Sequence, residues 1–113
     1  SKGILQMKEH QLSNFTRGWF IGNFSPSLLP TEHFEVAVQQ FKAGDKEARH
    51  VHKVATEFTV IVTGKAKMND QILDSGTVVE ISPGESASFE ALEDTVTTVV
   101  KVPCVAGDKY IVD

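Results

Sequence analysis

Cysteine is nearly absent from this chain, whose 113 residues include only Cys104. One thiol cannot form an intramolecular disulfide and excludes a zinc site built from several cysteines, so we interpret Cys104 as a small buried residue rather than a nucleophile. Positive charge is also scarce: 11 lysines and arginines face 15 aspartates and glutamates, for a formal net charge of −4. Because the basic residues are scattered, we expect no nucleic-acid partner.

Long apolar runs are missing as well. No stretch approaches the roughly 20 apolar residues that span a membrane, so we expect no membrane partner. No signal peptide is visible, and we expect a cytoplasmic protein. A chain of 113 residues, 41% of them hydrophobic, can bury one core but not two. With no repeat, low-complexity tract or linker, the sequence predicts one domain over residues 1–113.

Helical periodicity is almost absent, and short segments of alternating apolar and polar residues take its place. Such alternation is typical of half-buried strands. Turn-forming stretches, among them KAGDK, SPGE and TGKAKMNDQ, separate the segments. Many short strands at this spacing predict an all-β fold, an antiparallel β-barrel or jelly roll. The clearest predicted strands are FEVAVQQF (34–41), EFTVIVT (57–63), GTVVEIS (76–82) and TVTTVVKV (95–102).

The N-terminal third is less regular. Its segment GWFIGNFSPSLLP carries Trp19, Phe20 and Phe24 among glycines and prolines. This pattern fits an edge strand followed by a loop that covers the barrel, and it fits equally an arm exchanged between subunits.

Two histidines and a glutamate lie close together between the turn formers Gly44 and Gly64. His50 and His52 are one residue apart, so on a strand both side chains point to the same face. A tight reversal over residues 53–56 would bring the next strand back beside the first and aim Glu57 at the imidazoles. Two imidazoles and a carboxylate predict a divalent metal site. The alternative is a pair of surface or hydrogen-bonded histidines.

The spacing G-x5-H-x-H-x4-E-x6-G, met by Gly44, His50, His52, Glu57 and Gly64, resembles the first motif of the cupin superfamily. The resemblance covers about residues 34–102, and residues 1–33 form an N-terminal arm outside it. It implies a small single-domain cupin in which His50, His52 and Glu57 hold a divalent transition metal, either iron, manganese, nickel, cobalt or zinc.

The second cupin motif, G-x5-P-x-G-x2-H-x3-N, is only half present. Gly76 and Gly84 match, and Pro83 stands one place late. The expected histidine falls on Ala87 and the expected asparagine on Ala91. The usual fourth metal ligand is therefore missing, which leaves coordination positions for water or substrate but weakens retention of the ion.

The resemblance implies two functions. One is a metal-binding cupin that binds or transforms a polar small molecule, such as a sugar or sugar acid. The other is a non-catalytic small-molecule-binding or structural cupin with a vestigial metal site. Because single-domain cupins resemble dimers in which N-terminal strands pair with the partner's sheet, we also expect a homodimer with Trp19, Phe20 and Ile21 at its interface.

No residue is assigned as catalytic from the sequence. By strand parity, Gln40, Thr59 and Lys101 are candidates to face the lumen, and Phe89 is interpreted as core. The single tyrosine, Tyr110, lies near the C-terminus on a predicted outer face. This placement disfavours a metal-free sugar-nucleotide isomerase, since such enzymes pair a tyrosine acid with a histidine base. His10 and His33 are interpreted as surface residues.

Overall fold

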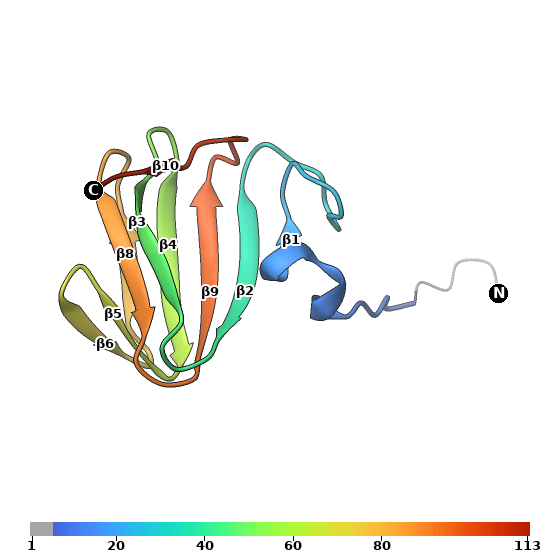
Figure 1. Ribbon diagram of the computed structural model, residues 1–113. Helices are drawn as coiled ribbons and strands as arrows, with labels where there is room; N and C mark the ends of the chain where they lie inside the picture. The colour runs from blue at the N-terminus through green and yellow to red at the C-terminus, as the bar shows by residue number, and fades with distance from the viewer. Residues whose placement is uncertain (1–5) are drawn as a thin grey trace.

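The alternating segments form two antiparallel β-sheets that face one another (Figure 1). The computed structural model describes residues 6–113. Its strands are β1 (Trp19–Ile21), β2 (Glu35–Phe41), β3 (Lys46–Val51), β4 (Thr56–Thr63), β5 (Lys65–Met68), β6 (Gln71–Asp74), β7 (Val78–Ile81), β8 (Ser86–Ala91), β9 (Thr95–Val102) and β10 (Tyr110–Ile111). Two short 3-10 turns, η1 (Leu12–Asn14) and η2 (Thr16–Gly18), precede the strands.

The strand order is that of a jelly roll. The first sheet has the order β1-β2-β9-β4-β7, and the second has the order β10-β3-β8-β5-β6. Successive strands therefore alternate between the sheets over much of the chain. The predicted all-β class is confirmed, and each of the four predicted strands matches an observed one to within two residues at either end. The stretch TGKAKMNDQ, predicted to be only a separator, contains β5; its Asn69 and Asp70, both with positive φ, form the turn to β6.

Apolar side chains between the sheets gather toward one end of the jelly roll. There, Ile61 of β4 and Ala66 of β5 are fully buried, and the rings of Phe41 and Phe89 pack with their centroids 4.5 Å apart. Phe89 is thus a core residue, as predicted. At the other end of the first sheet, the inward positions are occupied by the charged residues Glu35, Lys101 and Glu57. The core stabilises one end of the fold and leaves a polar space at the other.

Residues 53–55 connect the two sheets, which corrects one expectation from the sequence. The reversal after His52 was expected to return β4 beside β3. Instead, β3 pairs with β8 and β10, while β4 pairs with β7 and β9, so the two strands belong to opposite sheets. The alternation of β4 is nevertheless as predicted, with Glu57, Thr59 and Ile61 buried on its inner face. The carboxylate consequently approaches the histidines across the gap between the sheets.

The N-terminal part of the described chain forms an edge strand and a covering loop. β1 pairs with β2 through Trp19 opposite Ala37, and the loop residues Asn23 and Phe24 border the space between the sheets. Within this chain, β1 is thus an edge strand followed by a loop, as one of the two interpretations predicts, and an exchange of this arm between subunits stays a prediction. Residues 6–11 extend away from the sheets beyond β1 (Figure 1). The homodimer stays a prediction. No helix within residues 6–113 is long and apolar enough to cross a membrane.

Gly44 and Gly64 offer a matched test of backbone packing, because their φ angles are +93° and +94°. A Cβ at Gly64 would lie 2.3 Å from the carbonyl oxygen of Asp94, whereas one at Gly44 meets nothing within 4 Å. We predict that Gly44→Ala lowers the free energy of unfolding by about 1–2 kcal/mol, the cost of left-handed backbone for a residue with a Cβ. Gly64→Ala should cost about 2 kcal/mol more, because backbone must also move. Urea unfolding of both variants measures the difference, and equal losses would contradict the packing argument.

Candidate metal centre

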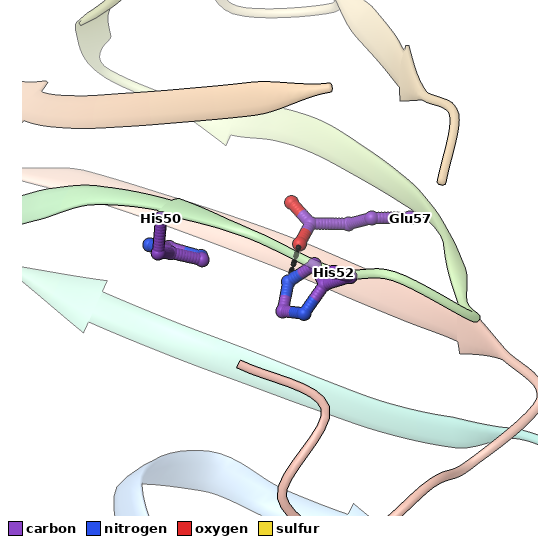
Figure 2. A group of neighbouring side chains, drawn as sticks. All are labelled: His50, His52 and Glu57. Carbon is purple, nitrogen blue, oxygen red and sulfur yellow. Dashed lines mark hydrogen bonds and ion pairs between the residues drawn. The ribbon is translucent and has the colours of Figure 1, made fainter. Parts of the chain in front are cut away.

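The predicted metal ligands come together between the two sheets. His50 lies near the end of β3, His52 follows directly after that strand, and Glu57 lies at the start of β4. One potential ligand atom from each of these residues lies within 4.8 Å of the other two. Figure 2 shows Glu57 extending toward His52, and the rings of His50 and His52 lying on the same side of the ribbon that carries them. The sequence motif thus describes a real cluster.

The ring of His52 is held by a backbone carbonyl. Its Nδ1 hydrogen-bonds to the carbonyl oxygen of Asp108, which can only accept, so Nδ1 carries the proton. Its Nε2 faces Glu57 Oε1 at 3.2 Å. When the ring is neutral, the Nε2 lone pair therefore points toward the carboxylate. His52 is only 4% exposed, which fixes this arrangement inside the fold.

His50 is oriented in the same way, although it is only half-buried. Its Nδ1 donates to the carbonyl oxygen of Ala48 at 2.9 Å, which leaves Nε2 without a proton in the neutral ring. Burial lowers the pKa of His50, and the charges of Lys109 and His52 lower it further, although the Ala48 hydrogen bond opposes them. A lowered pKa keeps the imidazole neutral at neutral pH, which is the form that binds a metal.

Glu57 is a buried carboxylate that stays ionised. Burial by itself raises its pKa, but three effects outweigh this and hold the pKa below its usual value. They are a hydrogen bond from His52 Nε2, which exists only when that ring carries both protons, the hydrogen bond from Thr59, and the charge of Lys101. Thr59 donates its hydroxyl to Glu57 Oε2 at 2.7 Å. Oε1 therefore remains directed at the histidines.

The donor set fits a divalent transition metal. It consists of two imidazole nitrogens, each with its other nitrogen bonded to a carbonyl, and one ionised carboxylate. An ion about 2.1 Å from each donor requires donors no more than about 4.2 Å apart. The observed upper limit is 4.8 Å, slightly longer than this value, so binding an ion requires a small shift of at least one of the three side chains.

Asp108, which the sequence reasoning missed, connects the C-terminal segment to this site. Its carboxylate accepts hydrogen bonds from the backbone amides of Lys53, Val54 and Ala55, the loop between His52 and Glu57. These amide bonds lower the pKa of Asp108, although burial opposes them. One residue thus orients His52 through its carbonyl group and the loop through its side chain. The only sequence signal was a turn-forming Gly107 before an aspartate, which is common in loops.

A cavity of about 410 Å³ opens beside the candidate metal ligands. Thr59 and Lys101 border it, as predicted. The prediction that Gln40 faces the lumen was wrong, because Gln40 is exposed and Gln39 borders the cavity instead. Gln39 pairs with Thr97 on the inner face of the first sheet, and side chains alternate, so a parity error of one residue reverses the face.

Ala87 occupies the position where the second motif expects a histidine. It is the cross-strand partner of His50 and borders the cavity, so a longer side chain there would approach the candidate metal ligands.

Cys104 is buried, as predicted, and its sulfur accepts a hydrogen bond from the backbone amide of Asn23 at 3.3 Å. Burial raises the pKa of Cys104, which disfavours the thiolate and a nucleophilic role.

The remaining sequence candidates lie outside the site. His10 and His33 are exposed, as predicted. Tyr110, in β10, does not border the cavity, and its ring contacts the ammonium of Lys53 at 4.0 Å. This position agrees with the outer-face interpretation.

No protein-family model matches this chain, and no curated protein matches it. Solved structures do. A conserved protein with a double-stranded β-helix domain from Klebsiella pneumoniae is 18% identical with a TM-score of 0.71, over 95% of this chain and 98% of that one. Oxalate decarboxylase from Bacillus subtilis is 17% identical with a TM-score of 0.64, over 73% of this chain and 24% of the enzyme. Mn(II) centres are known in that enzyme.

A sugar phosphate isomerase of the cupin superfamily from Silicibacter pomeroyi is 19% identical with a TM-score of 0.58. That match covers 62% of this chain and 50% of the isomerase. These likenesses establish the fold, which is that of the cupin superfamily.

Replacing Asp108 tests how the C-terminal segment supports the loop. We predict that Asp108→Ala lowers the free energy of unfolding by about 2–3 kcal/mol in the presence of chelator, because three amides lose a charged acceptor. Asp108→Asn retains one acceptor oxygen and should lose less. Glu85→Ala serves as a control, since the Glu85 side chain accepts one exposed amide, that of Ser82. Urea unfolding gives the values, and an Asp108→Ala loss no larger than that of the control would contradict the assignment.

Proposed function

We propose that this cupin-fold chain binds or transforms a polar small molecule, such as a sugar or sugar acid, at a divalent metal held by His50, His52 and Glu57. The observation that carries the proposal is that each of the two histidine rings bonds a backbone carbonyl through its Nδ1. Both rings thereby leave Nε2 free beside an ionised carboxylate, an arrangement with no evident need in a purely structural histidine pair.

A bound divalent ion would supply Lewis acidity and open coordination positions to a ligand in the cavity. The protein supplies the surroundings. Thr59 keeps Glu57 oriented, and Asp108 keeps His52 in the tautomer that presents Nε2. Iron, manganese, nickel, cobalt and zinc all suit two imidazoles and a carboxylate. The Mn(II) centres of the structurally similar oxalate decarboxylase support a divalent metal.

A polar ligand is supported by the cavity lining. The volume of about 410 Å³ suits a small molecule. Thr97 is 1% exposed and borders the cavity, and its hydroxyl oxygen has no hydrogen-bond partner among residues 6–113. Such a buried group is costly unless a ligand or water bonds to it. Trp19 and Phe24 add an aromatic wall on which the apolar face of a sugar can pack.

The alternative is a non-catalytic binding protein, and Ala87 is the observation that favours it. With three protein ligands, the ion is held less strongly than by four. The metal site would then be vestigial, and the same cavity would bind a small molecule without an ion. Metal content separates these two functions.

We predict that protein purified without chelator or polyhistidine tag contains about one transition-metal ion per chain, and that a His50→Ala, His52→Ala double variant contains none. Plasma mass spectrometry measures the content. The matched control replaces the same number of exposed histidines, His10→Ala and His33→Ala, and should keep the metal. If wild-type protein stays well below stoichiometry after incubation with each of the five metals, the metal-binding proposal fails.

Ala87→His tests the position of the missing ligand. We predict that metal affinity rises about tenfold or more, because the new imidazole lies across the strand pair from His50 and faces the cavity. Ala87→Leu fills the same space without a nitrogen and should not raise affinity. Competition with a chromogenic chelator gives the dissociation constants. Equal affinities of the histidine and leucine variants would place the ion elsewhere.

A further inference from the structure

Lys101 stands between two carboxylates on the inner face of the first sheet. In β9 it is the cross-strand partner of Glu35 in β2 on one side and of Glu57 in β4 on the other. Directly paired residues have Cβ atoms about 5 Å apart and point to the same face. All three side chains border the cavity. An ammonium group therefore lies beside the proposed metal ligand Glu57, within reach of a small molecule that also contacts the ion.

The charge of Lys101 is only loosely compensated. Its side chain is 15% exposed, and Nζ lies 4.0 Å from Glu35 Oε1 and 4.9 Å from the centre of the Trp19 ring. The first distance is too long for a hydrogen bond, and among residues 6–113 the Nζ atom has no hydrogen-bond partner. A largely buried ammonium without hydrogen bonds is costly, so its N–H groups are available to an acceptor in the cavity.

The charges around the cavity indicate what that acceptor is. Apart from the row Glu35–Lys101–Glu57, the charged lining residues balance in pairs, with Arg17 and Lys109 against Glu47 and Asp108. The row itself has one net negative charge. A divalent ion at Glu57 changes this to one net positive charge, which a monoanion neutralises. A dianion would overcompensate and meet the carboxylates of Glu35 and Glu57.

We propose that Lys101 binds the carboxylate of a small monoanionic ligand, one with a hydroxyl on the neighbouring carbon that reaches the metal. The inference rests on the proposed metal site and assigns to it a class of ligand, the 2-hydroxycarboxylates. Trp19 contacts the ammonium through a cation–π interaction, and the side chain of Lys101 borders the cavity. The Glu35 carboxylate accepts hydrogen bonds from any further hydroxyl groups of the ligand.

The test compares two ligands that differ at one carbon. Gluconate has a carboxylate where sorbitol has a hydroxymethyl group, and inorganic phosphate at about pH 8, where it is mostly doubly charged, represents a dianion. Protein loaded with Co²⁺, whose stoichiometry is measured first, is titrated with each by calorimetry and by its visible spectrum. Glycolate, the smallest 2-hydroxycarboxylate, is included so that the result does not depend on sugar stereochemistry. Chelator-treated protein should bind none of the carboxylates, because the row is then negative.

Lys101→Met is the decisive variant, and Lys109→Met is its matched control because it removes the same charge from an exposed position on the cavity rim. We expect Lys101→Met to keep one Co²⁺ per chain at saturating metal and to lose about tenfold to a hundredfold in affinity for glycolate and gluconate. Lys109→Met should lose about threefold at most, because solvent screens its charge. Lys101→Arg should restore part of the affinity. Circular dichroism verifies folding, and Lys101→Gln replaces Lys101→Met if the latter does not fold.

Each outcome has one meaning. Absence of Co²⁺ binding by wild-type protein overturns the proposed function, and the ligand class with it. Stoichiometric Co²⁺ with no carboxylate binding, or with sorbitol or phosphate bound more tightly than gluconate, leaves the metal site standing and overturns the ligand class. Equal carboxylate affinities in wild-type and Lys101→Met protein show that carboxylates bind the metal alone, which overturns the role of Lys101.

Discussion

The hydrogen bonds of Asp108 are the constraint on which the site depends. The carbonyl of this residue fixes the proton of His52 on Nδ1, and its carboxylate holds the loop that separates His52 from Glu57. Both effects act on the same few residues, so the direction of Nε2 and the position of the loop are coupled. Neither the cupin-like motif nor the strand pattern contains this residue. The three motif residues His50, His52 and Glu57 are therefore only part of the structure that orients the site.

The jelly-roll connection explains how a histidine pair and a glutamate five residues apart can face each other. β3 and β4 belong to opposite sheets, and residues 53–55 cross between them. His52 and Glu57 therefore meet across the interior, where burial strengthens the electrostatic coupling between ligands and neighbouring charges. The packed rings of Phe41 and Phe89 form the boundary between the apolar core and the cavity, because both rings also border the cavity.

The sequence predicts the fold class and the ligand cluster because both depend on local patterns. Alternation marks β4 and β9 clearly, and the spacing of His50, His52 and Glu57 is specific. What the sequence does not predict are features set by register and by distant segments. Gln40 was assigned to the interior although Gln39 occupies it, because a single residue of shift reverses the face. β5 was read as part of a separator and β6 was not predicted, because these four-residue strands hold few alternating positions. Asp108 and the Glu35–Lys101–Glu57 row become visible only when pairings between distant strands are known.

The separation of 56 residues between His52 and Asp108 has a consequence for the order in which the molecule is made. A ribosome completes the histidine pair and Glu57 long before it reaches the residue that orients His52. Until then, the nascent chain has the ligands but not their geometry, and long-range strand pairing is slow to form. At the proposed metal site, the growing chain would therefore compete poorly for metal, and tight coordination would begin only after β9 and the segment that follows it have been synthesised and docked. Translation would in this way set the earliest time at which the site can take up an ion.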